Sequence, residues 1–241
     1  MPKTSPELSI DTLPKVIFFD AMGTLFKLKS SVGEIYRQYA LKYGVEADAK
    51  IIEQAFSTSF KSAPPLAFTT TDFSLIKQHE FAWWKNVVES TFFQIDHLDQ
   101  FSDFTEFFTE IYVYFATKDP WLVFPDTINT LRKWQKLEVQ LGIISNFDSR
   151  LIGILHELNL LEFFTSVTIS SLAGFAKPES KIFEIALNKH KIAADQAWHI
   201  GDSLREDYQG ARNVGINSFW LNADSCLLNI ENQLPNLSSL G

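Results

Sequence analysis

Side chains that could take part in catalysis recur directly after short apolar segments of this chain. A carboxylate follows the first segment, a hydroxyl and an amide follow the second, a lysine stands after the third and two carboxylates follow the fourth. Because the carboxyl ends of parallel strands meet at one edge of a sheet, we expect these side chains to be neighbours. The residues are Asp20, Ser145, Asn146, Lys177, Asp202 and Asp207.

The chemistry of these groups is complementary. A carboxylate such as Asp20 can act as a covalent nucleophile. Asp20 and Asp202 could share a hard cation such as Mg²⁺, which prefers a few carboxylates together with water and substrate phosphate. Lys177 would supply the positive charge that a phosphoryl group in transfer requires. This set therefore favours Mg²⁺-dependent transfer of a phosphoryl group from a small phosphorylated substrate.

The elements that must position these residues alternate between strand-like and helix-like patterns. Short apolar runs are typical of buried parallel strands, and apolar residues at helical spacing separate them. We therefore predict an α/β fold with a parallel sheet covered on both faces. We expect Asp148 to cap a helix that begins near Ser149, and His199 to be a packed core residue. The predicted strands are 15–20, 139–145, 167–170, 197–201 and 218–221, and the predicted helices are 126–137, 151–158 and 180–189.

Residues 29–118 differ from the rest of the chain in their pattern of apolar residues, and we call them the helical insert. Apart from the ambiguous IYVYF at 111–115, they contain no strand-like run, and their apolar residues recur at helical spacing. One predicted helix ends at Gly44, a residue typical of a C-cap. We expect about four helices, with the phenylalanine stripe forming their core rather than binding a ligand. The α/β core then comprises residues 1–28 and 119–241.

The order of the motifs resembles the four-motif signature of the haloacid dehalogenase-like hydrolases. DxxGTL, SN at a strand end, KP and GDxxxxD follow one another between Val16 and Leu221, and an insert after the first motif is similar to the subfamily with a helical cap. The resemblance implies a Rossmann-like core and a cap that closes over the site. The implied roles are an aspartyl-phosphate on Asp20, phosphoryl contacts from Ser145 and Asn146, charge neutralisation by Lys177, and Mg²⁺ ligation by Asp20, the Met22 carbonyl, Asp202 and, directly or through water, Asp207.

The first motif departs from the phosphatases of that family at one position. They carry a second aspartate two residues after the nucleophile, where it protonates the leaving group, and this chain has Met22. A positioned general acid typically contributes a factor of about 10²–10⁴ in rate. The metal-independent dehalogenases of the family also begin this motif with Asp-Ala, so displacement of halide is an alternative. A protein that binds a phosphate ligand without turnover is another, and Glu34 is a candidate replacement acid.

Two observations favour a phosphatase over a dehalogenase. The metal-dependent members of the family keep the GDxxxxD motif, which lies here between Gly201 and Asp207. Dehalogenases carry an arginine about thirty positions after the nucleophile, but Arg37 stands only seventeen positions after Asp20. Because the site and not the fold decides function, these differences count for more than the shared fold.

Composition excludes several partners. The formal net charge of −8 and the absence of a Lys/Arg run argue against a nucleic acid ligand. The sequence contains no apolar run long enough to cross a membrane and no apolar stretch of a signal peptide near the N-terminus. Cys226 is the only cysteine, which excludes an internal disulfide and fits a reducing compartment. We therefore expect a soluble, cytoplasmic protein; its oligomeric state does not follow from the sequence.

Overall fold

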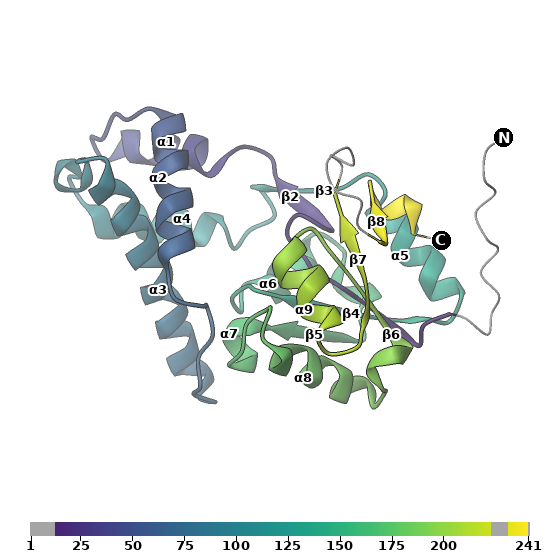
Figure 1. The fold of residues 1–241 in the computed structure, drawn as a ribbon. Coiled ribbons are helices and arrows are strands. Elements are labelled where there is room, and N and C mark those ends of the chain that lie inside the picture. The colour runs from purple at the N-terminus through teal and green to yellow at the C-terminus, as the bar shows by residue number, and fades with distance from the viewer. Residues whose placement is uncertain (1–12, 223–230, 241) are drawn as a thin grey trace.

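A parallel sheet and a separate group of helices make up the molecule (Figure 1). The computed structural model describes residues 13–222 and 231–240. The first twelve residues and Cys226, on which two of the expectations above depend, lie outside this part of the chain. Within it, no helix combines the length and the apolar character that crossing a membrane requires.

The sheet confirms the predicted α/β fold. Six strands lie in the order β5-β4-β1-β6-β7-β8, and each neighbouring pair is parallel. All five predicted strands are present to within one or two residues, and the short edge strand β8 adds a sixth. The strands are β1 (Val16–Phe19), β4 (Gln140–Ser145), β5 (Ser166–Ile169), β6 (Ala197–Gly201), β7 (Asn217–Leu221) and β8 (Gln233–Leu234).

Helices cover both faces of the sheet, because side chains of the central strand alternate between two buried clusters. Ile17 and Phe19 of β1 belong to one cluster, and Val16 and Phe18 belong to the other. The three predicted helices are confirmed. α5 (Thr127–Lys136) and α6 (Leu151–Glu157) pack in the first cluster, α8 (Ser180–His190) and α9 (Gly210–Arg212) in the second, and the short α7 (Ser170–Ala173) follows β5.

The helical insert forms four helices beside the sheet. Each begins at a side chain that accepts a backbone N–H of the first turn, which satisfies donors that a helix start leaves free. The run IYVYF is helical up to Tyr114, with Phe115 as the C-cap. Gly44, at φ +84°, follows the last residue of the first helix and its cap. The helices and their caps are α1 (Val32–Lys42; Ser31), α2 (Ala49–Ser62; Asp48), α3 (Phe73–Gln94; Asp72) and α4 (Phe104–Tyr114; Asp103).

The aromatic stripe of the helical insert is its core, as predicted. Phe107, Phe108 and Ile111 are at most 1% exposed and share a cluster with Tyr36 and Phe92. The ring centroids of Tyr36 and Phe92 are 6.2 Å apart, and those of Phe92 and Phe107 are 5.4 Å apart. Such ring pairs contribute stability beyond that of their buried area. The helical insert thus has a hydrophobic core of its own.

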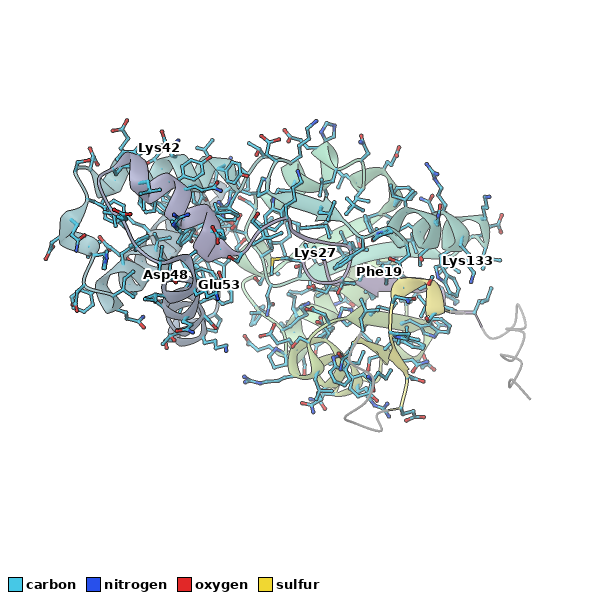
Figure 2. All side chains as sticks on the ribbon, turned by 90° about the horizontal axis from the view of Figure 1, so that it is seen from above. Phe19, Lys27, Lys42, Asp48, Glu53 and Lys133 are labelled. Atoms are coloured by element: carbon cyan, nitrogen blue, oxygen red, sulfur yellow. The ribbon has the colours of Figure 1, made fainter. Side chains whose placement is uncertain are left out.

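Two short strands join the helical insert to the sheet. β2 (Phe26–Leu28) and β3 (Trp121–Val123) pair antiparallel, so the two chain crossings run side by side. In Figure 2, Lys27 of β2 lies between the helical insert, with Lys42, Asp48 and Glu53, and the sheet, with Phe19. These strands were not predicted, because three residues are too few to show a period.

Candidate functional site

The loop after β1 brings Asp20 to the carboxyl edge of the sheet. Asp20 is 6% exposed, and its N–H donates to the Ile200 carbonyl of the neighbouring strand at 2.8 Å. Gly23 turns the loop with φ +92°, and a Cβ there would lie 2.3 Å from Asp202 Oδ2. Only glycine meets both conditions, and the close approach of this loop places Asp20 beside Asp202.

Lys177 lies between two buried carboxylates. Its Nζ donates to Asp20 Oδ1 at 2.6 Å and to Asp207 Oδ1 at 2.5 Å. Burial disfavours the charged ammonium, but Asp20 and Asp207 outweigh it and raise the pKa of Lys177 above its ordinary value. Because its pKa is raised, Lys177 stays positively charged at neutral pH. It precedes α8, as predicted.

Ser145 ends β4, Asn146 follows it, and both form hydrogen bonds with neighbouring groups of the site. Ser145 Oγ donates to Asp20 Oδ1 at 3.1 Å. The Asn146 amide donates to the Lys177 carbonyl at 2.9 Å and to Glu206 Oε2 at 3.1 Å, and its oxygen accepts the Lys177 N–H at 2.7 Å. Both N–H donors of the amide are thus engaged within the protein. The side-chain amide of Asn146 therefore holds the Lys177 backbone in place, and the contact of Asn146 with a phosphoryl group stays a prediction.

Asp207 is held inside the π-helical turn Leu204–Gln209. It accepts Lys177 and, through Oδ2, the Ser203 N–H at 3.0 Å, and His199 Nε2 lies 2.9 Å from its Oδ1. Burial would raise the pKa of Asp207, but Lys177 and His199 outweigh burial and lower it well below the usual range. A Cβ at Gly201 would lie 2.1 Å from Asp207 Cγ, so this carboxylate requires a glycine at position 201.

Asp202 completes an acidic cluster that suits a hard cation. Ligand oxygens of Asp20, Asp202 and Asp207 lie within 4.8 Å of one another. Partial desolvation, then the charges of Asp20 and Asp207, raise the pKa of Asp202 to about 7, and burial raises that of Asp20 despite Lys177. The Lys177 ammonium thus faces the three carboxylates of this cluster, and Glu206 is a further acid of the cleft lining. An all-oxygen donor set with excess negative charge fits a divalent cation such as Mg²⁺ or Ca²⁺.

A cleft of about 840 Å³ lies over these groups, lined by both the helical insert and the sheet-containing part. Asp20, Lys177 and Asp202 form part of its lining. Met22 also lines it, with a side chain 46% exposed. Glu34 is exposed in the first turn of α1 and does not line the cleft, so it is not placed to supply a proton there.

A buried polar contact fixes the helical insert against the loop after β4. Glu80 of α3 is fully buried and accepts the Ser149 N–H at 2.8 Å, the Ser149 hydroxyl at 2.6 Å and the Ser171 hydroxyl at 2.6 Å. Nearby, Trp84 of the same helix donates to Asp148 Oδ2 at 2.7 Å. The loop that carries Ser145 and Asn146 is thus bound to the helix that covers it.

The prediction that Asp148 caps a helix beginning near Ser149 is wrong: α6 begins at Leu151, and Arg150 stands at its N-cap position without a side-chain cap bond. Asp148 instead binds Arg150. It accepts the Arg150 N–H at 3.0 Å, and it also pairs twice with the Arg150 guanidinium, at 2.8 and 2.6 Å. The guanidinium in turn donates to the Tyr112 carbonyl of α4 at 2.8 Å and lies 3.8 Å from the Tyr112 ring centroid. The charged pair therefore links the sheet-containing part to two helices of the helical insert.

We expect Glu80→Ala to lower the free energy of unfolding by about 3 kcal/mol, because three hydrogen bonds from Ser149 and Ser171 would lose their buried acceptor. Urea unfolding of the purified protein measures this change. Glu89→Ala, on the same helix and without a comparable set of contacts, is the matched control and should change stability little. Equal effects of the two substitutions would show that the Glu80 contact does not hold the two parts together.

Two contacts at the site were not anticipated. His199 is buried, as predicted, but its Nε2 also reaches Asp207. The contact between His199 and Asp207 could have been anticipated, because residues 199 and 201 share one face of β6 and Asp207 packs on the glycine at 201. Glu80 offered no signal, since its partner Ser149 is 69 residues away along the chain.

A family model for haloacid dehalogenase-like hydrolases matches residues 14–215, and the chain belongs to this family of hydrolases. The chain is 34% identical over 206 residues to Haloacid dehalogenase-like hydrolase domain-containing protein 3 of Bos taurus, covering 85% of this chain and 80% of that protein. The human protein of the same name is 34% identical over 210 residues, with the same coverage. The family suggests a small-molecule substrate.

Solved structures share the fold and divide between two activities. A HAD phosphatase from Thermococcus onnurineus superimposes with a TM-score of 0.64 at 21% identity, covering 94% of this chain and 95% of that one. A 2-haloacid dehalogenase from Pseudomonas syringae gives 0.63 at 20% identity, covering 95% and 96%. At these identities the likeness shows the fold, so the choice between the two activities depends on the site.

Proposed function

We propose that this chain is a Mg²⁺-dependent phosphatase of a small phosphorylated substrate, acting through an aspartyl-phosphate on Asp20. The observation that carries this proposal is the cluster of Asp20, Asp202 and Asp207 around the single ammonium of Lys177. Displacement of halide from carbon needs no cation. A nucleophile placed in an acidic cluster with room for a divalent ion is suited to phosphoryl transfer instead.

Each residue has a defined task in this mechanism. A carboxylate oxygen of Asp20 attacks phosphorus, and the bond from phosphorus to the ester oxygen breaks. Lys177 neutralises charge on Asp20 and on the phosphoryl oxygens, and Ser145 orients the nucleophile. Mg²⁺, held by Asp20, Asp202 and the Met22 carbonyl, would supply further positive charge for the phosphoryl oxygens. Asp207 keeps Lys177 in place and contributes to the metal site directly or through water.

The helical insert, residues 29–118, acts in this proposal as a cap. It supplies one wall of the cleft, and the contacts of Glu80 with Ser149, Trp84 with Asp148 and Tyr112 with Arg150 hold that wall in place. A covered site excludes water until the phosphoryl group has been transferred and selects the substrate by the shape of its wall. Opening of the cap would require these buried contacts to break.

The experiment for the proposal is a release screen with purified protein. Phosphorylated metabolites and aryl phosphates are tested for phosphate release with Mg²⁺ and with chelator, and 2-haloacids for halide release. Phosphate release that requires Mg²⁺ supports the proposal. Halide release that persists in chelator would replace it with the dehalogenase alternative, and binding of phosphate ligands without release of either ion would indicate a non-catalytic protein.

Met22→Asp should raise the rate on alkyl phosphates by about 10²-fold, because it restores the general acid that this loop lacks. Aryl phosphates should gain far less, since their leaving groups depart without a proton. The Met22 side chain is 46% exposed in the cleft, so a carboxylate can replace it without entering the core. Rates on a leaving-group series at fixed Mg²⁺ measure the effect.

Met22→Asn is the matched control, since it has the same shape as the aspartate variant but cannot transfer a proton at neutral pH. It should leave the leaving-group dependence of the native protein unchanged. Equal rates for all leaving groups in the native protein, with no gain in Met22→Asp, would mean that another residue supplies the proton. Glu53, which lines the cleft, would then be the first residue to test.

A further inference from the structure

A series of aromatic rings in mutual contact lines the cleft, from the loop beside Asn146 to α2. We call it the aromatic ladder. It begins on the sheet-containing part, one residue after Asn146, and ends on the helical insert, and Asp20 lines the same cleft. Two inner rings of the aromatic ladder, Tyr36 and Trp121, are buried, so a ligand would reach the partly exposed rings of Phe147, Phe115, Phe56 and Phe60. Its successive ring centroids are Phe147–Trp121 at 6.2 Å, Trp121–Phe115 at 6.1 Å, Phe115–Tyr36 at 6.2 Å, Tyr36–Phe56 at 5.7 Å and Phe56–Phe60 at 5.6 Å.

Two indole N–H groups of the cap wall are already engaged within the protein. Trp83 Nε1 donates to the Pro64 carbonyl at 2.9 Å, and Trp84 Nε1 donates to Asp148 at 2.7 Å. The Glu53 carboxylate accepts the Gly33 N–H at 2.6 Å. A sugar hydroxyl placed against a ring face would lose its hydrogen bonds to water. This costs a few kcal/mol for each group that is left unpaired. Ser57 and Lys61 also line the cleft, but along its exposed rings an apolar body is favoured over a polyhydroxylated one.

The end of the cleft near Asp20 restricts the leaving group of the substrate. Met22, which lines it, offers no proton to a leaving oxygen. An alkoxide that leaves without a proton is a strong base and leaves slowly, whereas a phenolate is stabilised by its ring. An aryl group on the ester oxygen thus suits both ends of the cleft. Its ring can pack on the aromatic lining, and its oxygen can leave without a proton.

We infer that the substrate is an aryl phosphate whose planar ring contacts the aromatic ladder, an inference that rests on the proposed phosphatase activity. Asp20 forms a bond to phosphorus, the bond from phosphorus to the aryl oxygen breaks, and the phenolate departs with the electron pair. Water then attacks phosphorus, releasing inorganic phosphate and regenerating the Asp20 carboxylate. The proton released from water is taken up by solvent or by the phenolate, so no other reactant is required.

Phe60 gives the sharpest test of the substrate class. Its side chain lines the cleft at the end of the aromatic ladder and is 44% exposed, so Phe60→Ala leaves the core intact. We expect it to lower kcat/KM for 1-naphthyl phosphate about 3- to 10-fold. The rate on hexafluoroisopropyl phosphate, whose alcohol is about as acidic as a phenol but has no ring, should not change. Phe93→Ala, at a 70% exposed residue that does not line the cleft, should affect neither substrate.

A binding measurement separates the substrate class from the proposed activity. With Mg²⁺, 1-naphthylphosphonate, which cannot be hydrolysed, should bind at least about tenfold more tightly than methylphosphonate, and Phe60→Ala should reduce that preference. Absence of phosphate release from every ester, with this preference intact, would refute the phosphatase and leave the aromatic ligand. Equal binding of the two phosphonates, or faster turnover of sugar phosphates than of aryl phosphates, would overturn the inference.

Discussion

Asp20→Asn is expected to lower the Mg²⁺-dependent turnover of aryl phosphates by about 10⁴-fold or more, because an amide cannot form the covalent bond to phosphorus. Its stability should not fall. Burial raises the pKa of Asp20, so the ionised carboxylate opposes folding at neutral pH, and a neutral amide removes that cost. The amide oxygen can still accept from Lys177 and Ser145. Phosphate release and thermal unfolding in chelator measure the two effects.

Asp195→Asn is the matched control for this substitution, since it makes the same chemical change at an exposed site. It should retain native turnover and stability. Loss of activity in Asp20→Asn together with loss of stability would indicate a damaged fold rather than a missing nucleophile. Native turnover by Asp20→Asn would show that the covalent assignment is incorrect.

Lys177→Met should reduce both turnover and stability. Removing one partner from a buried ion pair leaves its charge uncompensated, which typically costs about 3–5 kcal/mol. Here Asp20 and Asp207 would both lose the ammonium that lies between them. We expect about a 10³-fold loss of turnover, since the phosphoryl group would also lose its positive neighbour. Lys181→Met, in an exposed i,i+3 pair with Glu184, is the control and should have little effect.

The pH dependence of the Lys177→Met defect identifies its cause. Without the ammonium, burial is expected to raise the pKa of Asp207 above its unfolded value, so the charged form opposes folding at higher pH. The difference in free energy of unfolding between the native protein and the variant should therefore shrink as the pH falls from 8 to 5. Mg²⁺ should also narrow it, by restoring positive charge. A defect that is independent of both pH and Mg²⁺ would mean that Lys177 contributes packing rather than charge.

Most of the sheet was predictable because buried parallel strands leave apolar runs that end in polar residues. Asp20 and Asp202 follow two such runs, and the parallel pairing of β1 with β6 brings them together. The short strands β2, β3 and β8 were missed, since two or three residues cannot show a period. The same limit applies to the π-helical turn that carries Asp207, which has no repeating apolar pattern to mark it.

The contacts that position the site were less predictable than the site itself. The Asn146 amide holds Lys177 and Glu206, and only the folded loops bring these residues together. The Glu80–Ser149 contact likewise depends on how a helix of the helical insert lies against a loop of the sheet. Such long-range pairs follow from tertiary packing, and no local pattern of residue types encodes them.

Peptide mass spectrometry of protein quenched in acid during turnover of phenyl phosphate tests the covalent role of Asp20 most directly. Because Met22 leaves the second half-reaction without its base, the phosphoenzyme should accumulate, in step with a burst of phenol release. The account predicts one phosphoryl group on Asp20 when Mg²⁺ is present and none after chelation. Steady phosphate release with Asp20 unmodified, or a phosphoryl group on a different residue, would contradict it.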